Sequence, residues 1–186
     1  MFEARQAPSF VALRINAHAG RYAGRVTNDQ TGELTLESAT GEVVPLSEFL
    51  DIPTVLVFFS PGCSACAELV PIARTWPNGL REGTDMQPVF FGTRAQFEAS
   101  DEAYQPLLDV AWYDPVGATM RGLGVTATPG AVAIDEEHPL GVGACLGSGA
   151  IGQLIMQYSQ VGGGPVTGTT TPAIVVPDIS GKLGNA

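Results

Sequence analysis

The sequence predicts a mixed α/β sandwich built around a central β-sheet. The segment from Thr54 to Phe59 is rich in β-branched and aromatic residues and shows no polar alternation, as expected of a strand covered on both faces. Further strand candidates alternate with helical segments, and the last two strand candidates form an antiparallel hairpin before a closing helix. Strands that alternate with helices and end in a hairpin indicate helices packed on a mixed sheet.

The chain of 186 residues is long enough for one domain with appendages, and such a domain can bury a core without disulfides. We expect an N-terminal extension at residues 1–31, a globular domain at 32–160 and a Gly/Thr/Pro-rich tail at 161–186. Within the extension, the alternation over Phe10–Asn16 and the extended pattern over Tyr22–Thr27 predict a β-hairpin. The composition of the tail is typical of segments that do not bury a core of their own.

The first part of the domain is predicted to form a small antiparallel unit. Leu34 and Leu36 alternate with polar residues, which indicates a strand, and a turn follows at Thr40-Gly41-Glu42. The segment from Val43 to Phe49 then predicts a short strand followed by a helical turn. This unit leads through Pro53 into the apolar strand described above.

A helix is predicted directly after that strand. The residues from Cys66 to Leu80 include helix-forming Ala, Glu, Leu and Arg, with Leu69, Ile72 and Trp76 at helical spacing. Pro71 lies inside this segment, where a proline costs about 3 kcal/mol unless a kink is useful. We therefore expect a strand-to-helix junction followed by a helix that contains Pro71.

The remaining segments continue the alternation of apolar, β-branched runs with runs of helix-forming residues. They predict, in order, a strand at Pro88–Gly92, helical material at Arg94–Val110 with a break at Pro106, a strand at Ala111–Asp114, a helix at Val116–Leu123, a strand at Gly130–Asp135, its hairpin partner at Gly141–Leu146 and a helix at Ile151–Gln160. Trp112 and Tyr113 are expected to be core or edge aromatic residues.

The charge balance excludes some classes of partner. Nine Lys and Arg residues stand against 19 Asp and Glu residues, so the net charge is -10 at neutral pH, which argues against nucleic acids and anionic membrane surfaces. The longest apolar run, around Val55 to Phe59, is too short to cross a bilayer, so no membrane span is expected in this chain. Residues 1–5 also lack the apolar core of a signal peptide.

Two of the three cysteines, Cys63 and Cys66, are three positions apart at the predicted strand-to-helix junction. A thiolate, not a thiol, attacks disulfides, and the first turn of a helix favours the thiolate through unpaired N–H groups and the helix dipole. The sequence therefore predicts a catalytic pair in which Cys63 attacks a substrate and Cys66 resolves the mixed disulfide.

The same spacing also occurs in zinc and iron–sulfur sites, which need further ligands. Only Cys145, His18 and His138 remain as candidates, without a second C-x-x-C or a closely spaced histidine pair, so no metal site and no cofactor is predicted. A purely structural role of the two cysteines stays open, as does a binding module that holds Cu(I) through soft thiolates. Cys145 is expected to pack in the core on a strand rather than to act as a third redox thiol.

Short motifs follow one another in a fixed order over residues 32–160. They are Leu34-Thr35-Leu36, Gly41, Leu46-Ser47-Glu48-Phe49, Phe58-Phe59-Ser60-Pro61-Gly62-Cys63-Ser64-Ala65-Cys66, Pro71, Asp114-Pro115-Val116-Gly117, Gly124-Val125 and Thr128-Pro129-Gly130. In this combination they resemble the thioredoxin superfamily, and within it the TlpA/ResA-like and methylamine-utilisation-accessory branch of extracytoplasmic thiol–disulfide proteins.

The resemblance implies a thioredoxin-like three-layer sandwich with a mixed central sheet, to which this chain adds the N-terminal β extension. It also implies a cis peptide bond before Pro129, which would lie beside the cysteine pair, and pairing of the Thr128 backbone with an extended substrate strand. Pro61 and Gly62, directly before Cys63, are expected to contribute to the same substrate-binding surface.

The function implied by the resemblance is the reduction or isomerisation of disulfides in extracytoplasmic proteins. A protein dithiol or disulfide is the expected substrate, and a membrane protein is the expected electron donor. The expected location is periplasmic or in the cell envelope, after removal of a signal or anchor, with a cytoplasmic location as the alternative.

Three positions depart from the family pattern. Gly62 stands where many relatives have an aromatic residue, and Val57 stands where thioredoxin carries a buried carboxylate. Glu68 is close to Cys66 in sequence, but two residues along a helix it should point away from Cys66 into solvent.

A peroxidase is a further alternative, because peroxiredoxins share the fold and carry a Pro-x-x-x-Thr-x-x-Cys arrangement. Alignment of Cys63 with their reactive cysteine places Ser60 at the threonine position, but it places Leu56 at the proline position, so the match is partial.

Overall fold

The computed structural model describes residues 34–159 of the chain. The predicted β-hairpin of the N-terminal extension and the predicted Gly/Thr/Pro-rich tail lie outside the described residues. Within residues 34–159, none of the helices combines the length and the apolar character that a bilayer crossing requires.

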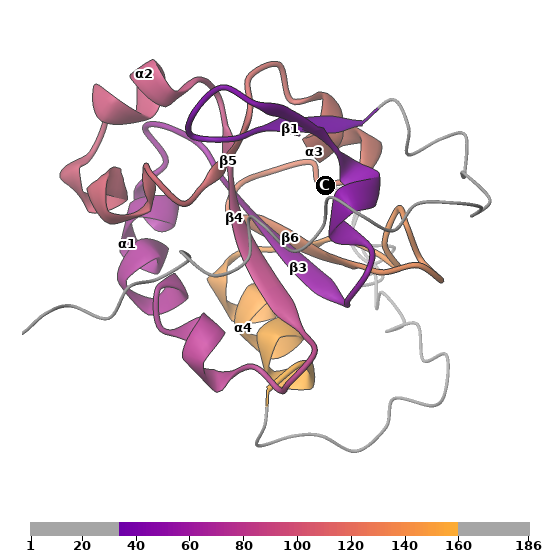
Figure 1. The fold of residues 1–186 in the computed structure, drawn as a ribbon. Coiled ribbons are helices and arrows are strands. Elements are labelled where there is room, and N and C mark those ends of the chain that lie inside the picture. The colour runs from indigo at the N-terminus through magenta and orange to yellow at the C-terminus, as the bar shows by residue number, and fades with distance from the viewer. Residues whose placement is uncertain (1–33, 160–186) are drawn as a thin grey trace, which may run out of the picture.

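Strands and helices alternate along the described chain (Figure 1). The strands are β1 Thr35–Glu37, β2 Val43–Pro45, β3 Thr54–Phe59, β4 Asp85–Phe91, β5 Trp112–Asp114, β6 Gly130–Ile134 and β7 Cys145–Leu146. The α-helices are α1 Ser64–Ala73, α2 Arg94–Glu98, α3 Ala118–Gly122 and α4 Ser148–Gln157, and the 3-10 helices are η1 Leu46–Phe49, η2 Trp76–Gly79 and η3 Glu102–Leu107.

The strands form one sheet in the order β2-β1-β5-β4-β3-β6-β7. The inner strands β5, β4 and β3 are parallel, whereas β1, β2, β6 and β7 join the sheet through antiparallel pairs. The predicted mixed sheet and its closing antiparallel hairpin are therefore confirmed.

Strand β3 lies between β4 and β6 and is buried along its whole length. Its side chains alternate between the two faces of the sheet, as a strand requires. Val55, Val57 and Phe59 belong to one buried cluster, and Leu56 and Phe58 belong to the other. A strand that serves two cores needs apolar side chains on both of its faces, which accounts for the unbroken apolar run from Val55 to Phe59.

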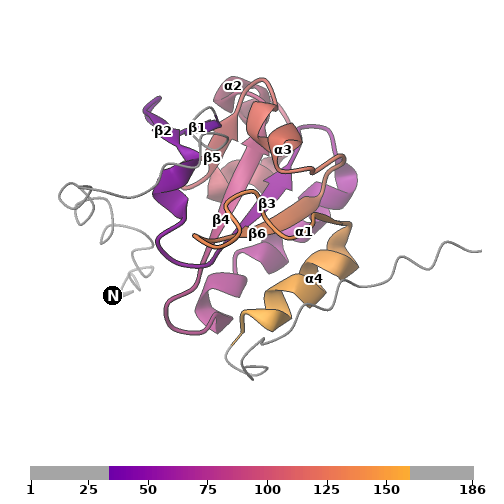
Figure 2. The same ribbon diagram turned by 90° about the vertical axis from the view of Figure 1, so that its right-hand side faces the viewer.

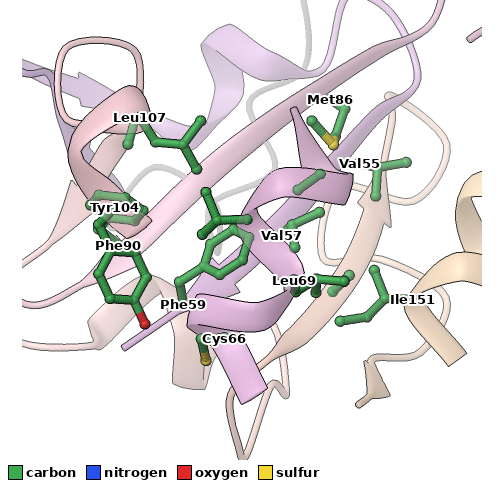
Figure 3. Packing of buried hydrophobic residues seen from close by; sticks show 14 of the residues in the cluster. Val55, Val57, Phe59, Cys66, Leu69, Met86, Phe90, Tyr104, Leu107 and Ile151 are labelled. Carbon is green, nitrogen blue, oxygen red and sulfur yellow. The ribbon is translucent and has the colours of Figure 1, made fainter. Parts of the chain in front are cut away.

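The two clusters make the molecule a three-layer structure (Figure 2). The first, here called the α1-side core, joins the sheet to α1, α2, η3 and α4 and includes Phe97. Figure 3 shows its members Leu69, Phe90, Tyr104 and Ile151. The second joins the opposite face to η1 and α3 and includes Leu46, Phe58, Met120, Leu123 and Val132. The predicted three-layer sandwich is confirmed.

The helix predicted for Cys66–Leu80 is shorter than expected. Helix α1 ends at Ala73, because the Thr75 amide donates to the Ile72 carbonyl at 2.9 Å and so tightens the last turn, and the short η2 follows. Of the apolar residues noted at helical spacing, Leu69 is buried, whereas the Ile72 side chain is 54% exposed. The buried positions recur at helical spacing from Cys66 and are Cys66, Leu69, Val70 and Ala73.

The predicted break at Pro106 was also misplaced. Helix α2 ends at Glu98, and the Ser100 hydroxyl donates to the Phe97 carbonyl. The Asp101 carboxylate then accepts from the Ala103 amide at 2.8 Å and begins η3, inside which Pro106 lies. Two local capping contacts therefore place the break before the proline.

Phe90 offers a test of the α1-side core, because its ring contacts those of Phe59, Phe97, Tyr104 and Tyr113. We expect Phe90→Ala to lower the free energy of unfolding by about 3–5 kcal/mol, as cavity formation at a buried aromatic ring does. Urea unfolding followed by circular dichroism measures the change.

The control for this substitution is Val116→Ala, at a side chain that is 70% exposed. It should change the free energy of unfolding by no more than about 0.5 kcal/mol. Equal effects of the two substitutions would show that the ring cluster is not central to stability.

Candidate active site

The loop between β3 and α1 carries the cysteine pair. Cys63 is the N-cap residue of α1, and Cys66 lies in the first turn of that helix. Gly62 has a φ of 73°, a left-handed conformation that disfavours side chains, and a Cβ there would meet nothing within 4 Å. Glycine is therefore used for the backbone turn, and this accounts for the absence of an aromatic residue before Cys63.

Cys63 and Cys66 form a disulfide in the structure, with their Cα atoms 5.2 Å apart. The Sγ atom of Cys63 accepts a hydrogen bond from the Cys66 amide at 3.1 Å. Cys66 is fully buried in the α1-side core, whereas Cys63 is half-buried at its edge. The more accessible sulfur is thus the one that faces a helix N–H group, which stabilises a thiolate.

The loop before β6 lies against the cysteine pair. The Thr128–Pro129 peptide bond is cis, and the Thr128 carbonyl oxygen is 3.6 Å from the Cys63 Sγ. The Thr128 hydroxyl also shares a 2.5 Å hydrogen bond with the Ser60 hydroxyl. The fold therefore brings the two motifs of the sequence together at one site.

Pro61 and Gly62 lie in the turn between Ser60 and Cys63. Pro61 is half-buried and Gly62 is exposed. Their contact with a substrate stays a prediction.

Tyr104 is a site residue that the sequence analysis missed. It comes from η3, is fully buried, and donates its hydroxyl to the carbonyl oxygens of Ser60 at 2.9 Å and Cys63 at 3.2 Å. Burial raises the pKa of Tyr104 to about 12, so the hydroxyl is protonated at neutral pH. These contacts join residues more than forty positions apart, and no local pattern could have indicated them.

The structure also places the positions at which a carboxylate could act on the pair. Val57 occupies the strand position noted above and is fully buried in the α1-side core. Glu68 is exposed, as predicted. The buried carboxylate of Asp114 accepts from the Met120 amide at 2.7 Å and so supports the start of α3.

The remaining metal-ligand candidates are dispersed in the described part of the chain. Residues 34–159 contain no group of three or more His, Cys, Asp or Glu side chains that could hold a metal ion. His138 instead lies 3.2 Å from the Asp135 carboxylate, and His18 is outside the described residues.

Cys145 lies on β7 opposite Ala131 and packs against the α1-side core. It is half-buried, so the predicted packing against the core is confirmed, although the side chain is not fully enclosed. Burial raises the pKa of the Cys145 thiol, which lowers the thiolate fraction at neutral pH.

Known structures share this architecture. The exposed lipoprotein thioredoxin of Streptococcus pneumoniae aligns with a TM-score of 0.53 and 21% identity, covering 67% of this chain and 98% of that one. DsbF of Mycobacterium tuberculosis aligns with a TM-score of 0.55 and 16% identity over 69% and 95% of the two chains. The chain has a thioredoxin-like fold.

A third thioredoxin-like structure is the thioredoxin domain of a thiol–disulfide oxidoreductase from Bacteroides vulgatus. It aligns with a TM-score of 0.51 and 17% identity, covering 69% of this chain and 97% of that domain. No protein-family model matches the chain, and neither does any curated protein sequence. Similar solved structures are thus thioredoxin-fold thiol–disulfide oxidoreductases, and the present chain carries a C-x-x-C disulfide.

Because its pKa is raised, Cys145 should react slowly with iodoacetamide in the oxidised native protein. The same thiol should react at the rate of an ordinary cysteine peptide once the protein is unfolded in urea. Mass spectrometry of the alkylated protein at pH 8 gives both rates. Equal rates in the native and unfolded protein would contradict the protection inferred from burial.

Proposed function

We propose that this protein is a thiol–disulfide oxidoreductase that reduces or isomerises disulfides of extracytoplasmic proteins through Cys63 and Cys66. The observation that carries the proposal is the cysteine pair at the start of α1, with the Cys63 sulfur beside both the Cys66 amide and the Thr128 carbonyl. Its support from comparison is the thioredoxin-like fold shared with thiol–disulfide oxidoreductases.

In the reductive direction, the Cys63 thiolate attacks one sulfur of a substrate disulfide. That disulfide breaks, a mixed disulfide forms between Cys63 and the substrate, and the other substrate sulfur leaves as a thiolate. Cys66 then loses its proton and attacks the Cys63 sulfur, which releases the second substrate thiolate and forms the Cys63–Cys66 disulfide. Two electrons pass from the protein to the substrate, and solvent protonates the substrate thiolates according to pH.

Substrate binding is assigned to the surface around Cys63. The Thr128 backbone would pair with an extended segment of the substrate, and Pro61 and Gly62 would border the same segment. The 3.6 Å distance between the Thr128 carbonyl oxygen and the Cys63 sulfur would bring a strand paired at Thr128 next to the reacting atom.

An extracytoplasmic location and a membrane electron donor complete the proposal. The similar structures include an exposed lipoprotein thioredoxin and a secreted disulfide oxidoreductase of Mycobacterium tuberculosis. A reductase in an oxidising compartment needs a supply of electrons from elsewhere, because its disulfide must be reduced again after each turnover.

We expect Cys63→Ser to reduce the exchange rate to the level without protein, because a hydroxyl does not replace a thiolate nucleophile. Cys66→Ala should instead accumulate a mixed disulfide, since Cys63 can attack but nothing resolves the product. Reduction of a peptide disulfide, followed by fluorescence and by non-reducing mass spectrometry, measures both effects.

The matched control is Cys145→Ser, which removes the third thiol and should leave the exchange rate unchanged. Full activity of Cys63→Ser would contradict the proposal. Stoichiometric copper in protein purified under reducing conditions would favour the Cu(I)-binding alternative, and rapid peroxide consumption by Cys63 would favour the peroxidase.

A further inference from the structure

The hydroxyl of Tyr104 holds both ends of the loop that carries Cys63. Its single proton is shared between the Ser60 carbonyl at the end next to β3, at 2.9 Å, and the Cys63 carbonyl at the end next to α1, at 3.2 Å. Between these two anchors lie Pro61 and Gly62, and Gly62 is exposed. The turn itself is thus open to solvent, whereas its two ends are held from the buried side.

The ring of Tyr104 is itself fixed in the α1-side core. It makes edge-on contacts with Phe90 at 5.6 Å and Phe97 at 5.0 Å between ring centroids, and it is fully buried. Figure 3 shows Tyr104 beside Phe90. Because the ring is fixed by these contacts, its hydroxyl is also fixed and holds the loop carbonyls at a set position relative to the core. Its pKa of about 12 means that it acts as a donor to these carbonyls rather than as a base at neutral pH.

We propose that Tyr104 is a positioning residue that keeps the Cys63 sulfur in place against the Cys66 amide when the cysteine pair is reduced. This inference rests on the proposed function. It assigns an effect on the redox equilibrium of the cysteine pair to a residue outside the C-x-x-C and Thr128-Pro129 motifs. It predicts that the Tyr104 hydroxyl favours the dithiol form over the disulfide form.

The preference for one redox state follows from the connectivity of the site. In the oxidised protein the disulfide holds Cys63 next to Cys66 covalently. In the reduced protein that restraint is gone, and the hydrogen bond from the Cys66 amide to the Cys63 sulfur depends on the position of the Cys63 backbone. Because this bond is charge-assisted when Cys63 is a thiolate, its loss costs the reduced state more than the oxidised state.

Tyr113 provides a matched control on the same core. Its ring also contacts Phe90 edge-on at 5.6 Å, and its buried hydroxyl donates to the Leu108 carbonyl at 2.7 Å. Tyr113→Phe therefore removes one buried hydroxyl, as Tyr104→Phe does, but its partner is a single carbonyl outside the cysteine loop rather than the two loop carbonyls bound by Tyr104. A purely structural effect should be similar in the two variants.

The experiment compares Tyr104→Phe and Tyr113→Phe in the Cys145→Ser background. Each protein is equilibrated with reduced and oxidised glutathione, so that the protein dithiol and glutathione disulfide exchange to give the protein disulfide and two glutathione thiols. We expect Tyr104→Phe to raise the constant for this oxidation about threefold to tenfold, the range of one buried hydrogen bond. A tenfold change corresponds to about 30 mV toward a more negative potential.

The pH dependence of Cys63 alkylation gives a second readout. In Tyr104→Phe its midpoint should move to higher pH, because the thiolate has lost part of its support, whereas Tyr113→Phe should leave the midpoint and the glutathione constant unchanged. If Tyr104→Phe matches the unsubstituted protein in both readouts and differs only in stability, Tyr104 is structural and the inference is overturned.

Incorporation of 3-fluorotyrosine at position 104 covers the case in which the phenylalanine variant does not fold. Fluorination keeps the ring and the hydroxyl but makes the hydroxyl a stronger donor, so the glutathione constant should shift in the opposite direction. An unchanged constant would again overturn the inference. Failure of the proposed function can be distinguished from failure of this inference. If the proposed function fails, the protein does not exchange with peptide disulfides, but the glutathione equilibrium of each variant can still be measured.

Discussion

Cys63 can occupy the position before α1 because the chain between β3 and this helix is held at both of its ends. On one side β3 is buried between β4 and β6, and on the other the first turn of α1 enters the core at Cys66. The intervening turn needs the left-handed conformation of Gly62. With these constraints, the Cys63 sulfur faces the Cys66 amide without help from any charged side chain. The reactivity expected of Cys63 is therefore a consequence of where two elements of the fold meet.

Cys66 connects this site to the stability of the fold. It starts the buried face of α1, which continues through Leu69, Val70 and Ala73, and it packs in the same core as Phe59 and Phe90. One turn of helix therefore separates a buried sulfur, that of Cys66, from a half-buried sulfur, that of Cys63. Burial disfavours a charged thiolate at Cys66, whereas the helix N–H groups favour one at Cys63. The order of attack proposed for the two cysteines follows from this difference.

Local patterns predicted the central strand and the cysteine pair, because both depend on short-range chemistry. The apolar run after Pro53 matches β3, and the C-x-x-C lies at the strand-to-helix junction where the sequence placed it. The buried face of α1 was predicted less well, since spacing alone did not show that the face starts at Cys66 and leaves Ile72 exposed. Tyr104 could not be predicted, because its contacts with Ser60 and Cys63 exist only once η3 has packed beside α1.

The surroundings of Val57 explain why an apolar residue, and not a carboxylate, occupies this position. Val57 faces the α1-side core and pairs with Pro88 and Ala131 across the sheet, so a carboxylate there would need a partner that its sheet neighbours do not offer. Tyr104 supplies a polar group to the same region, but it donates to backbone carbonyls and stays protonated. In the proposed mechanism, backbone amides, burial and the Tyr104 hydroxyl would therefore provide the control of reactivity that a buried acid would otherwise provide.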